Sequence, residues 1–226
     1  MEIQTSLVSQ NYQTNLKKAN STNVEDTFKN IIGEDGTLNI SFDESELRNL
    51  SYEEAKALRV KLEESGHLQA TDANGNQLAT FGSSLLQVTN LTNDDSFNKA
   101  MFETMKNSEE PGLMLMELKH NMEYSQGKRA HPWPTLSLDE VQGNMTQLTP
   151  EEFRNIDVKK FLDEIIKTYE ELLLNLPHYL DKNETEETLN GYKELKEKYQ
   201  KELDEKSAIL ESYTKNNKEN PFINKE

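Results

Sequence analysis

The side chains of this chain that could carry acid–base or metal chemistry begin with its four histidines: His67, His120, His131 and His178. They lie in four different segments, and no two have the His-x-x-x-His spacing that places both rings on one helix face as metal ligands. His131 and His178 each adjoin a proline, where we expect loops. One alternative therefore stays open, a small hydrolase-like enzyme with a histidine-containing site between the N-terminal and C-terminal halves, around His131 or His178.

Acidic residues are too common in this sequence to mark a site by themselves, since there are 41 of them. The stretch Asp72–Asn76 has the composition of a calcium loop, but an EF-hand needs glycine at its sixth position and glutamate at its twelfth. Here the glycine is fourth and Ser83 is twelfth. The sequence also lacks a phosphate-cradling glycine loop and a Gly-x-Ser-x-Gly elbow. It therefore predicts no catalytic, cofactor-binding or metal site, and a protein that is not an enzyme.

The overall composition limits the classes of partner. The chain has 226 residues, a net charge of -16, 34% hydrophobic residues and a mean hydropathy of -0.87. An acidic surface repels nucleic-acid phosphates and anionic lipids, and no apolar run approaches the roughly 20 residues of a membrane span. We therefore expect another protein as the partner, with no nucleic acid and no membrane insertion. The absence of cysteine excludes disulfides and thiolate chemistry.

The clearest structural element is a helical hairpin over residues 149–214. Thr149-Pro150-Glu151-Glu152 forms a capping box with proline at the first helical position, and a break is expected near Asp157. Pro177 should end the first helix, and a second should begin near Asn183. Apolar residues recur at helical spacing in both arms: Val158, Leu162, Ile165, Tyr169, Leu172 and Leu176 in the first, and Leu189, Tyr192, Leu195, Tyr199, Leu203, Leu210 and Tyr213 in the second.

This pattern fits either an intermolecular coiled coil or an antiparallel hairpin that closes on itself. Arms of three or four heptads joined by a short turn favour the hairpin. Lys196 and Lys206 also fall on the second seam, where a long dimer would place apolar residues. We therefore expect an antiparallel hairpin and favour a monomer.

The N-terminal part is expected to contain a disordered leader and a small α+β module. Residues 1–22 are mostly polar and small, so they cannot bury enough apolar surface to become ordered. In composition this leader resembles the uncleaved N-terminal leaders of proteins exported by flagellar or other type III machines. The pattern of residues 23–91 predicts, in order, a helix at 24–32, a strand at 37–42, a helix opened by Ser51 and a β-hairpin over 67–81.

Residues 92–130 are predicted to form a methionine-rich helical region, with helices at 94–106 and from Pro111 to before Gly127. Methionine is flexible and adapts to different partners, although it also fills protein cores. The candidate partner-binding residues of this region are Met101, Met105, Met114, Leu118 and Met122.

Residues 131–148 are expected to be a linker that proline and tryptophan organise. Pro132 and Pro134 bracket Trp133, the only tryptophan, and force an extended path. Trp133 and its two prolines could then form a rigid partner-binding anchor. The alternative is that Trp133 folds back as a latch between the two halves, which the scarcity of apolar residues favours. Residues 215–226 are expected to be a disordered tail.

Together these features predict a mainly α fold with a small α+β N-terminal module and a C-terminal antiparallel helical hairpin. The predicted function is that of a non-enzymatic protein-interaction protein without a cofactor. Within that class we favour a bacterial protein that is made in the cytoplasm and exported without a cleaved signal peptide, or that is associated with secretion. Another alternative is a cytosolic chaperone or adaptor whose hairpin is the working surface.

Overall fold

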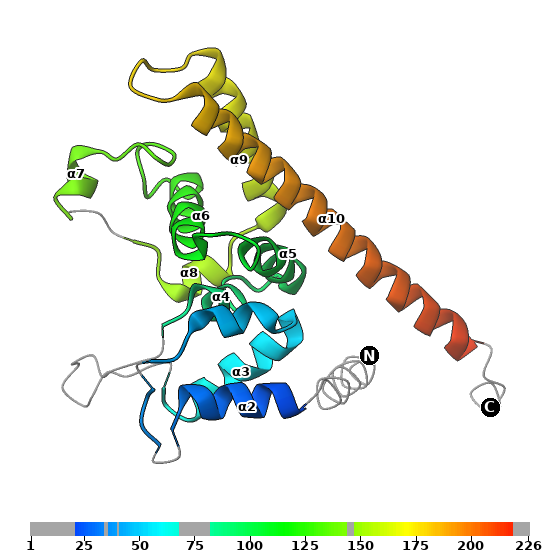
Figure 1. Cartoon of the computed structure of the whole chain (residues 1–226). Coiled ribbons are helices and arrows are strands. Elements are labelled where there is room, and N and C mark those ends of the chain that lie inside the picture. The colour runs from blue at the N-terminus through cyan, green and yellow to red at the C-terminus, as the bar shows by residue number, and fades with distance from the viewer. Residues whose placement is uncertain (1–20, 34–35, 40, 68–81, 144–146, 219–226) are drawn as a thin grey trace. The chain divides into compact units, whose positions relative to one another are not determined.

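The computed structural model describes residues 21–33, 36–39, 41–67, 82–143 and 147–218, and every regular element in them is helical (Figure 1). These residues form nine α-helices and one 3-10 helix, with no strand among them. The predicted mainly α fold is therefore confirmed. The chain divides into two compact units, the first formed by residues up to 91 with 102–116, and the second by residues 92–101 with those from 117 onward.

The first unit is built around α3 (Tyr52–Glu64), which packs against α2 (Ser21–Ile31) and α4 (Ser84–Val88). The 3-10 helix η1 (Glu44–Asn49) precedes α3. Apolar side chains from these elements are buried together, among them Ile31, Leu47, Tyr52, Ala55, Leu58, Leu62, Leu86 and Val88. The predicted capping box opens α3, because Ser51 Oγ accepts from Glu54 N at 3.3 Å and Glu54 Oε2 accepts from Ser51 N at 2.8 Å.

The predicted α+β character of this unit is not supported by the described residues. The expected strand at 37–42 reduces to one antiparallel bridge between Ile32 and Leu38. After this bridge the chain turns, since Phe42 N donates to the Asn39 carbonyl oxygen at 3.2 Å. Asp43 then caps η1, with its Oδ1 accepting from Ser45 N at 2.8 Å. Most of the expected β-hairpin, residues 68–81, lies outside the described residues. So does the expected leader up to residue 20, while residues 21 and 22 already belong to α2.

The second unit combines parts of two central helices with the C-terminal half of the chain. It includes residues 95–101 of α5 (Asp95–Met105) and residues 117–125 of α6 (Pro111–Ser125), both close to their predicted bounds. The short helix α7 (Leu138–Val141) lies within the segment expected to be a linker. The remaining helices are α8 (Pro150–Arg154), α9 (Val158–Leu174) and α10 (Lys182–Lys218).

The predicted antiparallel helical hairpin is confirmed as α9 and α10, which pack side by side (Figure 1). Lys193 Nζ lies 2.7 Å from a Glu170 carboxylate oxygen, and Lys196 Nζ lies 2.6 Å from Asp163 Oδ1. The two helices are therefore antiparallel, because a higher residue number on α10 faces a lower one on α9. Lys196, which interrupts the seam in the sequence, is accommodated because Asp163 on the facing helix supplies the opposite charge.

The ends of the hairpin helices follow local capping chemistry. Thr149 and Glu152 form the predicted capping box, and Asp157 caps α9 by accepting from Lys160 N at 3.0 Å, which explains the predicted break. The second helix begins at Lys182, next to Asn183, as predicted. Asp181 is its cap, because its Oδ1 accepts from the N–H groups of residues 183 and 184 at 2.8 and 3.0 Å.

The helix α10 is much longer than α9, with 37 residues against 17, and it continues past the end of its partner (Figure 1). Near that point the Tyr199 hydroxyl donates to Asp94 Oδ2 at 2.5 Å, and Lys99 donates to Glu202 at 2.6 Å. The following part of α10, residues 203–218, is called the overhang below. It spans about 24 Å at 1.5 Å per residue. It includes the first residues of the expected disordered tail, which are helical as far as Lys218; residues 219–226 lie outside the described part of the chain.

Candidate functional site

The proline-bracketed segment that carries Trp133 is held by its backbone against α6 and α9. Trp133 N donates to Asn121 Oδ1 at 2.9 Å, and the Tyr169 hydroxyl donates to the Trp133 carbonyl oxygen at 2.6 Å. His120 Nε2 lies 3.0 Å from the carbonyl oxygen of His131, and the His120 ring meets the Trp133 ring edge-on at 5.6 Å. Trp133 is thus folded back and half-buried, but these contacts all lie within the second unit, so they do not show the latch between the two halves that the sequence favoured.

Asn121 is the centre of this arrangement and is fully buried. Its Nδ2 donates to the Tyr169 hydroxyl at 3.1 Å and to the Tyr192 hydroxyl at 2.8 Å, while its Oδ1 accepts from Trp133 N. One amide therefore links α6, the Trp133 segment and both arms of the hairpin. Both of its donor hydrogens are used inside the unit, so this polar cluster serves the fold and offers little to an external ligand.

The same cluster contains groups whose protonation the surroundings alter. Burial raises the pKa of the Tyr169 and Tyr192 hydroxyls, so both stay protonated and able to donate. Burial also raises the pKa of Glu117 to about 7. Glu117 lies one turn before Asn121 on α6, and its charge raises the pKa of both tyrosines further.

Glu117 and His120 have the Glu-x-x-His spacing, a signal that the sequence analysis missed. Residues three apart lie on the same helix face, and a carboxyl that titrates near neutral pH suits acid–base chemistry. However, His120 is buried with its Nε2 against the His131 carbonyl. Among the described residues, no group of three His, Cys, Asp or Glu side chains could hold a metal ion.

The other histidines lie in unrelated surroundings. The side chain of His131 is exposed, and that segment meets His120 through its backbone carbonyl. His178 is exposed at the turn of the hairpin, with its ring edge-on to Tyr179 at 5.7 Å. His67 belongs to the first unit, where its Nδ1 lies 2.9 Å from Ser65 Oγ after the end of α3.

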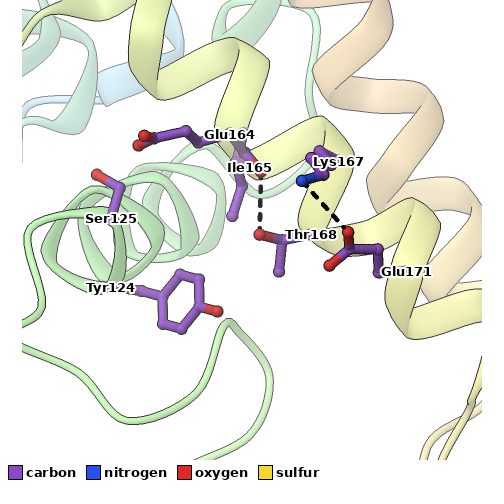
Figure 2. A pocket seen from close by; sticks show the side chains of 7 residues that line it. All are labelled: Tyr124, Ser125, Glu164, Ile165, Lys167, Thr168 and Glu171. Atoms are coloured by element: carbon purple, nitrogen blue, oxygen red, sulfur yellow. Dashed lines mark hydrogen bonds and ion pairs between the residues drawn. The ribbon is translucent and has the colours of Figure 1, made fainter.

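A hollow of about 330 Å³ lies between the end of α6 and the middle of α9 (Figure 2). Most of its polar side chains have local partners: Ser125 donates to the Met122 carbonyl, Thr168 to the Glu164 carbonyl, and Lys167 lies 3.5 Å from Glu171. Figure 2 shows the contacts of Thr168 and Lys167 running along α9, while Ser125 lies apart from them on α6. The hollow therefore lacks the converging polar groups of a small-molecule site. Its lining residues are Tyr124, Ser125, Glu164, Ile165, Lys167, Thr168 and Glu171.

The predicted partner-binding methionines are mostly inside the protein. Met101, Met105, Leu118 and Met122 are buried, and Met114 is half-buried. In this structure they fill cores and do not form an open groove. Of the proline-bracketed residues, Pro132 and Trp133 are half-buried and Pro134 is exposed.

Two of the three most exposed large apolar side chains among the described residues lie instead at the turn of the hairpin. Leu174 is 81% exposed and Tyr179 is 63% exposed, and Leu173, Leu176 and Leu180 beside them are half-buried. We call residues 173–180 the hairpin tip. Its backbone is ordered by hydrogen bonds from Asn175 N to the Leu172 carbonyl at 3.2 Å and from Leu180 N to the Pro177 carbonyl at 3.0 Å. A preformed apolar tip loses little conformational entropy when it binds.

The surroundings of the hairpin tip are acidic. Residues 170–187 contain six acidic residues and one lysine, a net charge of -5. Glu184 and Glu187 are exposed on the first turns of α10. Three of the other carboxylates are in ion pairs: Glu170 with Lys193, Glu171 with Lys167 and Glu186 with Lys182. The tip is thus an apolar surface with a negatively charged border.

Comparison with known proteins does not place the chain in a family. It matches no protein-family model, no curated protein and no solved structure. Within the described residues, no helix is both long enough and apolar enough to cross a membrane.

Proposed function

We propose that this protein is a non-enzymatic protein-interaction protein and that the hairpin tip is its working surface. The observation that carries the proposal is the exposure of Leu174 and Tyr179 on an ordered turn at the end of two packed helices. Single exposed apolar residues are ordinary on protein surfaces, but here two exposed large apolar side chains lie beside three half-buried leucines at one turn, and such a group is typical of a binding site. Leucine and tyrosine held in this way can enter a complementary pocket as anchors.

The acidic border specifies the kind of partner. An apolar groove that is bordered by lysine or arginine side chains matches both the leucines of the tip and the carboxylates of its border. An anionic bilayer matches only the leucines, because its surface charge repels a segment with a net charge of -5. The partner is therefore another protein with a basic rim around an apolar groove.

Photocrosslinking in cells of the source organism tests this proposal. A benzophenone amino acid replaces Tyr179 in the full chain, and a matched variant carries it at Lys167, an exposed position on α9 away from the turn. We expect a protein adduct at Tyr179 that is absent at Lys167. Mass spectrometry should identify the crosslinked peptide of the partner, and this peptide should line an apolar groove bordered by Lys or Arg.

Two further variants separate binding from folding. Leu174→Ser exchanges a side chain that is 81% exposed, so the far-ultraviolet circular dichroism should not change, while the Tyr179 adduct should be lost. Glu184→Lys with Glu187→Lys should reduce the adduct, because the charge of the border is reversed. A lipid adduct, equal adducts at both positions, or no adduct at Tyr179 would each contradict the proposal.

Export is a separate proposal that the sequence supports through the polar composition of residues 1–22 and the lack of cysteine. We propose that the leader directs the chain through a flagellar or type III-like route in a bacterium. A reporter fused after residue 22 should leave the cell only when that secretion machine is intact. Retention of the fusion in a secretion-competent strain would exclude this route, and it would leave the role of the hairpin tip unaffected.

A further inference from the structure

The buried stripe of α10 continues along the overhang, where no helix of the second unit covers it. Within the hairpin the stripe consists of Leu189, Tyr192, Leu195 and Tyr199, all buried. Steps of three and four residues lead from Tyr199 to Leu203, Lys206, Leu210 and Tyr213, the same face of the helix. Leu210 is 47% exposed and Tyr213 is 54% exposed, and the neighbouring Ile209 is 55% exposed. The overhang thus repeats the seam of the hairpin without a second arm.

The charges of the overhang are arranged with opposite signs at its two ends. Asp204, Glu205 and Lys206 lie at its start, with a net charge of -1, and Lys215 and Lys218 lie at its end, with a net charge of +2; Glu211 lies between them. Two such helices in antiparallel orientation place the acidic start of each beside the basic end of the other. The match is best when the helices cross near Leu210, because Glu205 of one copy is then level with Lys215 of the other. The apolar residues lie around the same centre.

We propose that the overhang binds the overhang of a second copy of this chain, antiparallel and about a two-fold axis near Leu210. An isologous contact of this kind needs one self-complementary patch, which the apolar centre and the oppositely charged ends provide. Lys206 lies on the seam, and in this register it is opposite Thr214, so a polar residue meets a polar residue and helps to set the register. The inference uses none of the residues of the hairpin tip and stands independently of the proposed function.

The expected strength follows from the length of the overhang. Two heptads per copy bury less than the ~1,200 Å² of a stable complex. The dimer should therefore be weak and reversible, with a dissociation constant of about 10–100 μM. At lower concentrations the chain should be a monomer.

Because the chain has no cysteine, single-cysteine variants report the geometry directly. Leu210→Cys places a thiol at the proposed axis, so a disulfide-linked dimer should form at about 100 μM under mild oxidation and be lost at about 1 μM. Leu203→Cys should give no dimer, since its two copies would be about 21 Å apart. A dimer with both variants would indicate parallel pairing and would overturn the proposal, and so would a dimer with neither.

Sedimentation equilibrium of the cysteine-free chain tests the same contact without crosslinking. Leu210→Glu should weaken dimerisation at least about tenfold, because it puts a charge at the centre of the interface. The matched control is Ala208→Glu, which adds the same charge on the opposite, exposed face of α10 and should have little effect. The proposal is overturned if the unmodified chain is a monomer at 500 μM (about five times the largest dissociation constant expected). It is also overturned if both variants dimerise equally.

Discussion

Removal of the Asn121 side chain should test whether the buried polar cluster holds the second unit together. In Asn121→Ala, the Trp133 N–H and the Tyr192 hydroxyl lose the partners seen at 2.9 and 2.8 Å, while the Tyr169 hydroxyl keeps the Trp133 carbonyl at 2.6 Å. A buried polar group without a partner costs about 1–3 kcal/mol. Two such groups, with a small cavity, predict a loss of about 3–5 kcal/mol in the free energy of unfolding.

The fluorescence of Trp133 during urea unfolding is the appropriate assay, because the only tryptophan of the chain lies in the segment that Asn121 holds. The matched control is Asn190→Ala, an exposed asparagine on α10, which should change stability by no more than about 0.5 kcal/mol.

A double-mutant cycle with Tyr192→Phe isolates the contribution of the Asn121–Tyr192 bond. Tyr192→Phe alone should cost about 1 kcal/mol, and the pair should cost about 1–2 kcal/mol less than the sum of the single changes. The reasoning is refuted if Asn121→Ala costs less than about 1 kcal/mol, or if the two changes are additive.

Other contacts of the second unit give smaller effects. Burial raises the pKa of Glu117 to about 7, above its ordinary value of 4.5, so the folded state holds that proton more tightly. The contribution of this proton to the free energy of unfolding is fully present below pH 4.5 and is lost as the pH rises through 7, a decline of up to about 3 kcal/mol. Urea titrations between pH 5 and 8 should show this decline, and Glu117→Gln should abolish it. The Lys196–Asp163 pair is about half exposed, so a double-mutant cycle should give a coupling of only about 0.2–1 kcal/mol that falls with added salt. Tyr199→Phe removes the hydrogen bond to Asp94 and should lower the free energy of unfolding by about 1–2 kcal/mol. Adding Asp94→Asn to this variant should lower it no further.

Elements with strong local signals could be predicted from the sequence alone. The capping boxes at Ser51 and Thr149 satisfy backbone donors through residues three positions away, so they act the same way in any tertiary setting. The heptad spacing likewise predicts the hairpin, because it depends on the helical repeat. Where a local signal was weak, as at 37–42, the turn and the capped 3-10 helix that follow decided against the predicted strand.

The tertiary structure decided which of these residues are available to a partner. Met101 and Met122 carry the same side chain that a partner-binding groove would use, yet neighbouring helices bury them. Leu210 continues the seam of Leu195, yet it is exposed because α9 is shorter than α10. The Asn121 cluster joins residues up to 71 positions apart, so it has no local signal. Spacing along the chain determines the face on which a residue lies, whereas burial depends on what the rest of the fold places against that face.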